Sequence, residues 1–261
     1  MKSLLICHKG APLDQVVLAR WLAESTELVG IIELDETRTR VMKRVRREVR
    51  RVGWVRFFDV LAFRVWYRLF HAARDRAWEE RTVAEYAKRL PALPANLPRL
   101  EIHSPNTAEA KAFIERLAPD FMVARCKQLL KREIFGIPRL GTYVMHPGVC
   151  PEYRNAHGCF WALANGDRDK VGMTLLKIDE GVDTGPVYGY FSYDIDEVAE
   201  THFVIQSRVV LDNLDRLAET FRAIDAGTAP TIDTRGRPSG TWGQPWLTRW
   251  LSWKRAARRR A

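Results

Sequence analysis

Two segments of the chain carry side chains suited to acid–base chemistry. His146 follows the apolar run 142–145 and begins a loop that contains two prolines. Further along, residues 178–186 form a glycine-containing turn with three acids, Asp179, Glu180 and Asp183. An imidazole exchanges protons near neutral pH, and a neighbouring carboxylate can fix its tautomer and orientation. The two segments therefore predict a general acid–base pair at the end of a strand.

The cysteines show no pattern typical of a metal site. They form no CxxC pair and no other ligand spacing, so we expect reduced thiols in a cytoplasmic protein and no bound metal. The four are Cys7, Cys126, Cys150 and Cys159. Cys150 is close to His146 in the sequence, but no base for a nucleophilic thiol is evident, and we interpret it as a small buried hydrophobe.

The elements that must position these residues alternate between strand and helix. Short apolar runs alternate with segments of helical periodicity from residue 4 onwards. We expect strands at 4–7, 28–32, 100–103, 121–124, 142–145, 174–178 and 186–191, and helices at 13–22, 107–117 and 201–226. This order indicates an α/β fold with an open, mostly parallel sheet and flanking helices, whose functional sites lie at the carboxyl ends of the strands.

The positive charge of the chain is concentrated in two segments. The formal net charge is +10, but residues 36–56 hold nine basic and two acidic residues, and residues 245–261 hold six basic residues and no acid. The rest of the chain balances at −3. In the first segment, valines at 41, 45, 49 and 52 recur at helical spacing and predict an amphipathic basic helix. Residues 54–74 predict a second helix.

Three partners fit such segments: nucleic acid, an anionic membrane surface, or acidic groups of the same fold. We expect the helices to pack on the body as a basic insertion at 36–95. A peripheral position at the inner face of the membrane stays open as the alternative, and nucleic acid is less favoured. The apolar runs are interrupted by charges, so we expect no membrane span. Residues 1–226 would then form one α/β domain, followed by an extended Trp- and Arg-rich tail at 227–261.

Four motifs occur in a fixed order around the acid–base residues. They are His-Pro-Gly-x-x-Pro-x-Tyr-Arg at 146–154, Trp-Ala-Leu-Ala-Asn-Gly at 161–166, Gly-x-Thr at 172–174 and Asp-Thr-Gly-Pro at 183–186. Together they resemble the tetrahydrofolate-dependent formyltransferases, which include glycinamide ribonucleotide, methionyl-tRNA and sugar N-formyltransferases. The resemblance covers residues 121–187 and extends loosely to 226. It implies a Rossmann-like fold and transfer of a formyl group from 10-formyltetrahydrofolate to an amine.

The resemblance also implies roles for individual residues. His146 matches the family's catalytic histidine, which stabilises the oxyanion and helps to move the proton of the amine, and Asp183 matches the aspartate that orients it. The family's folate pocket, formed largely by backbone, corresponds to Gln128, Leu129, Leu130, Asp179, Glu180, Gly181 and Val182. The Cys150–Pro151 peptide bond is expected to be cis, as the equivalent bond is in relatives.

One position departs from the family pattern. An asparagine that supplies a second oxyanion donor lies two residues before the histidine in the family, and this chain has Val144 there. Loss of one such donor costs about 3–4 kcal/mol, or about a hundred- to a thousandfold in rate. Asn155, where relatives usually carry glycine, is expected to replace the missing amide in the catalytic site, with His157 as the alternative.

The acceptor is inferred partly by elimination. The loop at 8–12 lacks the Gly-Ser-Asn phosphate cradle of the purine enzyme, and we expect no room for the C-terminal barrel of the tRNA enzyme. An amino sugar or another small primary amine remains, and a phosphorylated or nucleotide-linked form of it stays open. Lys9, Arg154 and His157 are the candidate contacts. Arg154 is equally suited to tying down its own loop. Two other functions stay open: hydrolysis of formyl-folate or transfer from another formyl or carbamoyl donor, and a catalytically silent protein.

Overall fold

The computed structural model describes residues 1–261 apart from the side chains of Arg38 and Arg40. Seven strands form one sheet in the order β3-β2-β1-β4-β5-β7-β8. They are β1 (Lys2–His8), β2 (Glu27–Leu34), β3 (Arg99–Ile102), β4 (Phe121–Arg125), β5 (Gly141–His146), β7 (Met173–Lys177) and β8 (Val187–Phe191). The first five are parallel, and β7 and β8 run antiparallel to their neighbours. The expected open, mostly parallel α/β sheet is confirmed.

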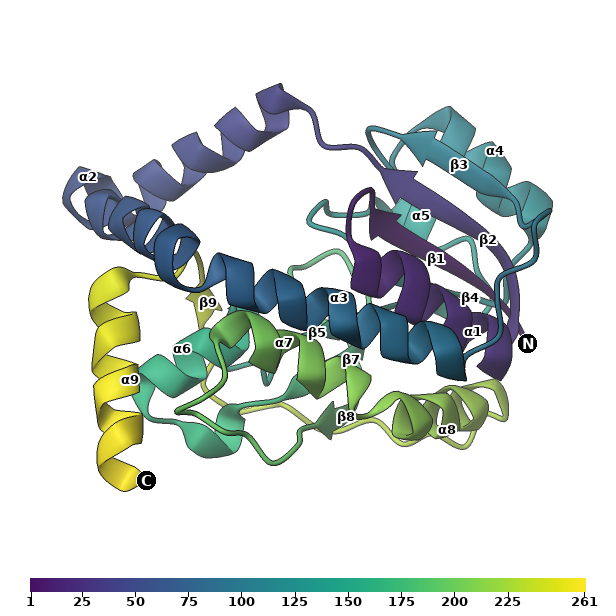
Figure 1. The fold of residues 1–261 in the computed structure, drawn as a ribbon. Helices are drawn as coiled ribbons and strands as arrows, with labels where there is room; N and C mark the ends of the chain where they lie inside the picture. The colour runs from purple at the N-terminus through teal and green to yellow at the C-terminus, as the bar shows by residue number, and fades with distance from the viewer.

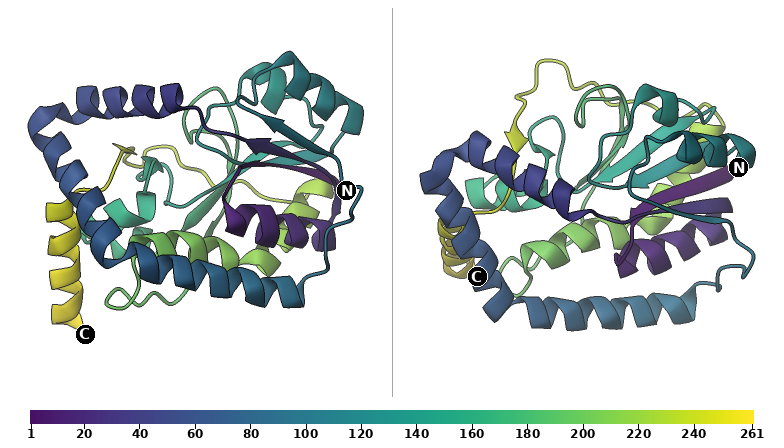
Figure 2. Two further views of the ribbon diagram at one scale, coloured as in Figure 1. Left: turned by 45° about the horizontal axis from the view of Figure 1, so that its top comes forward. Right: turned by 90° about the horizontal axis from the view of Figure 1, so that it is seen from above.

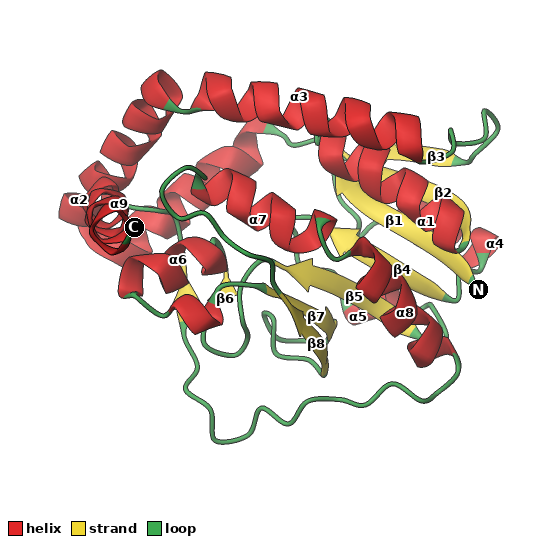
Figure 3. Ribbon diagram, turned by 60° about the horizontal axis from the view of Figure 1, so that its bottom comes forward, coloured by secondary structure: helices red, strands yellow, loops and turns green.

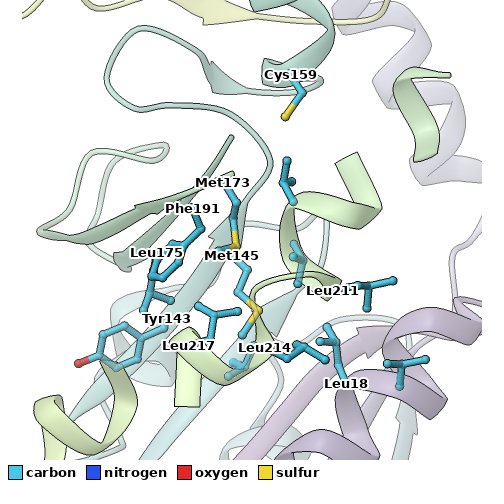
Figure 4. Close-up of a cluster of buried hydrophobic side chains, with 14 of the residues drawn as sticks. Leu18, Tyr143, Met145, Cys159, Met173, Leu175, Phe191, Leu211, Leu214 and Leu217 are labelled. Atoms are coloured by element: carbon cyan, nitrogen blue, oxygen red, sulfur yellow. The ribbon is translucent and has the colours of Figure 1, made fainter. Parts of the chain in front are cut away.

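The sheet is covered on both faces because its strands are apolar on both sides. In β1, Leu5 and Cys7 belong to one buried cluster, and Leu4 and Ile6 belong to the other. This alternation follows from the two-residue period of a strand. Figure 4 shows part of the larger cluster, in which strand residues such as Met145 meet helix residues such as Leu217.

Helices flank the sheet on both sides (Figures 1 and 3). The larger cluster lies under η1 (Leu13–Leu18), a π-type helical segment, and under α1 (Ala19–Ser25), α6 (Gly158–Asn165), α7 (His202–Leu211) and α8 (Leu214–Asp225). The smaller cluster lies under α4 (Ala108–Leu117) and α5 (Arg132–Phe135), and a short 3-10 helix, η2, spans Arg168–Lys170. The long helix expected at 201–226 is two helices. The break lies at Asn213, which is buried and donates its side-chain amide to the carbonyls of Ser192 and Val209.

The basic insertion forms α2 (Arg38–Phe70) and α3 (Ala72–Arg89). Gly53 divides α2 into two straight parts, since its φ of 77° is a left-handed value that glycine adopts without a steric penalty. The second part packs on the body through Phe57, Val60 and Phe63, as expected, but its opposite side is exposed. Figure 2 shows α2 leaving β2 and bending, and α3 returning along the body. The sequence did not predict α3, which contacts η1 and α7.

The C-terminal segment is extended only in its first part. Residues 227–246 run along the body and include β9 (Thr241–Trp242), which pairs in parallel with β6 (Arg154–Asn155). The segment then forms α9 (Leu247–Arg260), which the sequence did not predict and which packs against α2 and α6 (Figure 3). Buried Trp250 and Trp253 anchor it. None of the described helices is long and apolar enough to cross a bilayer.

Candidate active site

His146 is the last residue of β5, at the carboxyl edge of the parallel part of the sheet. The alternation of side chains along β5 places His146 and Val144 on one face, while Met145 enters the large core on the other. His146 is buried and pairs across the sheet with Thr174 of β7. The strand therefore fixes the backbone of His146 and delivers its ring to one side of the sheet edge.

Asp183 reaches His146 because β7 and β8 form a hairpin next to β5. The turn of this hairpin holds Asp183 with a φ of 51°, a left-handed conformation that aspartate tolerates better than most residues. One carboxylate oxygen, Oδ2, lies 3.4 Å from Nδ1 of His146. The same oxygen accepts a hydrogen bond of 2.7 Å from the backbone N–H of Asn155. The carboxylate is thus held beside the imidazole by the loop that follows β5.

The other ring nitrogen of His146 determines the tautomer. Nε2 lies 2.7 Å from the backbone oxygen of Tyr153. A carbonyl oxygen can only accept a hydrogen bond, so Nε2 carries a proton. In the neutral ring, Nδ1 then has the free lone pair and faces Asp183. This edge can take up a proton, and the carboxylate of Asp183 stabilises the imidazolium that results.

The loop between His146 and Asn155 is held tightly against the sheet. Thr174 donates its hydroxyl to the carbonyl of Gly148 at 2.6 Å and accepts from the N–H of Cys150 at 3.0 Å. A Cβ at Gly148 would lie 2.5 Å from the oxygen of Tyr153 and 2.8 Å from Nε2 of His146, so only glycine fits there. The Cys150–Pro151 peptide bond is cis, as expected. Burial raises the pKa of the Cys150 thiol, in agreement with a structural role.

A cavity adjoins Asp183. It is lined by six of the seven residues expected in a folate pocket: Gln128, Leu129, Leu130, Asp179, Glu180 and Gly181. The seventh, Val182, is absent from the lining, and its carbonyl accepts a hydrogen bond from Arg154 instead. Val144, Leu176 and Ile178 add apolar walls. The mixture of apolar walls and backbone groups suits a flat, polar-edged ligand.

Comparison with known proteins agrees with this arrangement. The family described as formyl transferase matches residues 73–218. The chain belongs to this family. It is 34% identical over 143 residues to the methionyl-tRNA formyltransferase of Clostridioides difficile, which covers 53% of this chain and 45% of that protein. It is 40% identical over 91 residues to the enzyme of Halorhodospira halophila, covering 34% and 29%. These matches span less than half of the relatives' length.

Solved structures show the same fold at low sequence identity. A likely sugar N-formyltransferase from Mycobacterium tuberculosis is 15% identical with a TM-score of 0.56, covering 98% of this chain and 87% of that one. A sugar N-formyltransferase from a Shewanella species is 15% identical with a TM-score of 0.54, covering 93% and 77%. The resemblance to the formyltransferases, first seen in four short motifs, is therefore confirmed at the level of family and fold.

Two other predicted site residues of this member of the formyl transferase family, Asn155 and Lys9, have their side-chain partners elsewhere. The side-chain amide of Asn155 donates to the carbonyl of Trp242, so the pairing of β6 with β9 directs it to the C-terminal segment. Asn155 holds Asp183 through its backbone rather than through the amide that was expected to replace the family's asparagine. Lys9 forms an exposed ion pair of 2.6 Å with Glu101 on β3, the edge strand far from β5. The side-chain amide of Asn155 thus has a partner in the C-terminal segment, and the roles expected of Asn155 and Lys9 stay predictions.

Arg154 and His157 have identifiable neighbours. Arg154 donates to the carbonyl of Val182 and to the hydroxyl of Ser239, both at 3.0 Å, so it ties the turn that precedes Asp183 to its own loop. His157 begins α6, and its Nδ1 is buried without a hydrogen-bond partner among the described atoms. Burial, followed by the positive charges of Lys127 and Arg64, lowers the pKa of His157 to about 4.

Sequence reasoning missed three cations at the sheet edge. Arg125 ends β4, forms an ion pair of 3.0 Å with Asp14 and donates at 2.7 Å to the carbonyl of Met145, directly before His146. The positive charges of Lys127 and Arg64 contribute to the lowered pKa of His157. The position of Arg125 and Lys127 directly after a parallel strand was a usable signal. Arg64 has no such signal in the sequence, since it lies in the helical insertion and not at the end of a strand.

Proposed function

We propose that this protein transfers the formyl group of 10-formyltetrahydrofolate to the primary amine of a small, negatively charged acceptor. The observation that carries the proposal is the pair formed by Nδ1 of His146 and Oδ2 of Asp183, 3.4 Å apart, beside a cavity that includes Asp183 in its lining. Membership of the formyltransferase family supports the reaction class.

The cavity fits the pterin end of a folate. Leu130, Val144 and Leu176 provide apolar surface for the flat faces of the ring system, and the backbone at 128–130 and 179–181 provides donors and acceptors for its edge. A bound 10-formyltetrahydrofolate supplies the formyl carbon that the amine attacks. A formyl oxygen can be polarised by an imidazolium, and the proposal gives this task to His146.

The geometry gives His146 two tasks. As the amine nitrogen bonds to the formyl carbon, the lone pair on Nδ1 accepts the proton that the amine loses, and the positive charge of the imidazolium stabilises the oxygen on which negative charge develops. The proton then passes to N10 as the bond between N10 and the formyl carbon breaks, and tetrahydrofolate leaves. Asp183 stabilises the protonated ring and is itself fixed by the N–H of Asn155. The hydrogen bond from Nε2 to Tyr153 prevents the ring from turning its other edge to the reaction.

The acceptor is proposed to bind beside the His146–Asp183 pair, in the direction of His157. Lys127 and Arg64 bring positive charge there, and Nδ1 of His157 offers a polar atom without a partner in the described structure. These groups suit a phosphorylated or nucleotide-linked amine, such as an amino sugar. Lys127 and Arg64 replace Lys9 in this role, and Arg154 acts on the position of Asp183 rather than on the acceptor.

A single assay tests the proposal. The full chain is incubated with 10-formyltetrahydrofolate, with and without a panel of amino sugars and nucleotide-linked amines, and the release of tetrahydrofolate is followed. We expect release that depends on an amine and that falls about 10²- to 10⁴-fold in His146→Asn. Release without an amine would indicate hydrolysis, and folate binding without release would indicate a silent protein. Ile232→Ser, an exposed substitution outside the site, is the matched control.

A further inference from the structure

The second part of α2 exposes a row of large apolar side chains to solvent. Six of them are 60–85% exposed: Trp54, Val55, Phe58, Val65, Leu69 and Phe70. Trp54, Phe58, Val65 and Leu69 are spaced by four, seven and four residues, so they form one stripe along the helix, which we call the α2 stripe together with Val55 and Phe70. A helix that is apolar on its packed face and on its free face is unusual in water, and such a patch indicates an interaction surface.

Basic side chains lie at both ends of this helix. On the first part of α2, Lys43, Arg46, Arg47 and Arg50 line an open depression of about 650 Å³. At the other end, Arg255, Arg258 and Arg259 of α9 line a second depression of about 970 Å³ together with Trp66, His71, Trp250, Leu251 and Lys254. Among the residues whose side chains the structure describes, no acid lines either depression. Figure 2 shows α2 and α9 together along one outer edge of the molecule.

We propose that this edge docks the protein on the surface of an anionic lipid bilayer. The α2 stripe would enter the boundary between headgroups and acyl chains, and the two basic clusters would contact lipid phosphates on either side. Docking takes place at the surface, because none of the described helices is able to span a bilayer. The proposal does not depend on the chemistry at His146.

The charges favour a lipid surface over a second copy of this chain. Two copies that covered each other's α2 stripe would bring the arginines at 46, 47 and 50 and those of α9 towards a surface of the same sign. Like charges brought together across an interface oppose association, whereas an anionic bilayer neutralises every one of them. The apolar α2 stripe thus matches the acyl chains of a bilayer, and the basic clusters on either side of it match the anionic headgroups.

Vesicle flotation of the full chain tests this. We expect the protein to float with vesicles of phosphatidylcholine mixed with phosphatidylglycerol, to float far less with phosphatidylcholine alone, and to be released by added salt. Replacing Arg46, Arg47 and Arg50 together by Gln should weaken binding about 100-fold, at about fivefold for each charge. Phe58→Ser combined with Leu69→Ser should abolish flotation, since it removes the apolar part of the contact.

Matched controls separate docking from misfolding and from catalysis. Ile232→Ser and Arg235→Gln alter exposed residues of the same types outside the patch and should float like the parent chain. Circular dichroism should show unchanged folding, and formyl transfer to a soluble amine should be the same in the stripe and arginine variants as in the parent. Absence of flotation, flotation insensitive to the arginine variant, or a stable dimer that only the Phe58 and Leu69 variant dissociates would overturn the proposal.

Discussion

Restoring an amide at position 144 is the sharpest test of how this site stabilises negative charge. Val144 lies two residues before His146 on the same face of β5 and lines the cavity beside Asp183. Its side chain is partly buried among Cys150, Leu176 and Val187. Val144→Asn conserves approximate size and adds an N–H donor next to the imidazole. If the formyl oxygen lies between these two side chains, the new donor contributes about 3–4 kcal/mol in the transition state.

We therefore expect Val144→Asn to raise kcat about 10²- to 10³-fold in tetrahydrofolate-release assays. The polar group sits in a partly apolar site, so the free energy of unfolding should fall by about 1–3 kcal/mol, measured by urea denaturation. Val144→Ile, which adds no donor, is the control and should leave kcat within a fewfold of the parent. An unchanged kcat in Val144→Asn, with folate binding intact, would refute the placement of the oxyanion beside position 144.

Three further predictions follow from the loop after β5. Gly148→Ala should reduce kcat at least 100-fold, because a Cβ would contact the oxygen of Tyr153 and Nε2 of His146; retained activity with a native circular dichroism spectrum would contradict the fit. Arg154→Gln should lower kcat about tenfold through the released Asp183 turn while KM for the acceptor stays constant, and a rise in KM instead would make Arg154 an acceptor contact. The unfolded chain protonates His157 near its ordinary pKa, whereas the folded chain keeps it neutral down to about 4. Stability should therefore fall by at most about 3 kcal/mol as pH drops from about 6.5 to about 4, and His157→Asn should remove this part of the dependence in urea titrations.

The sheet and the His146–Asp183 pair were accessible from the sequence because both depend on local patterns. Apolar runs bounded by polar turns mark β1, β2, β4 and β5, and a residue that ends a parallel strand lies at the sheet's carboxyl edge whatever the rest of the chain does. Asp183 follows another route: β7 is antiparallel to β5 and ends opposite Tyr143, and the turn at 178–186 then comes back to place Asp183 beside His146. The resemblance added the cavity residues, of which six of seven line the space beside Asp183.

Features formed by distant segments could not be predicted in this way. The amide of Asn155 was expected in the site, but β9 pairs with β6 and supplies the Trp242 carbonyl, which no local pattern of the 146–157 loop indicates. The cations Arg64 and Lys127 approach His157 from the insertion and from the segment after β4. The mixture of Trp and Arg in the α9 segment predicts an irregular tail. The helix depends on its contacts with α2 and α6, which the local sequence does not indicate.

The pairing of β6 with β9 also bears on when the site becomes complete during synthesis. Asn155 must meet Trp242, 87 residues further along, and Trp161 stacks on the same indole at 4.9 Å. Arg154 likewise donates a hydrogen bond to Ser239, which is 85 residues further along the chain. A nascent chain that lacks residues 239–242 would already contain His146 and Asp183. It would still lack the strand β9, which pairs with β6 in the loop between them. The loop that carries Asn155 therefore reaches its final form only after residues 239–242 have been synthesised and have paired with it.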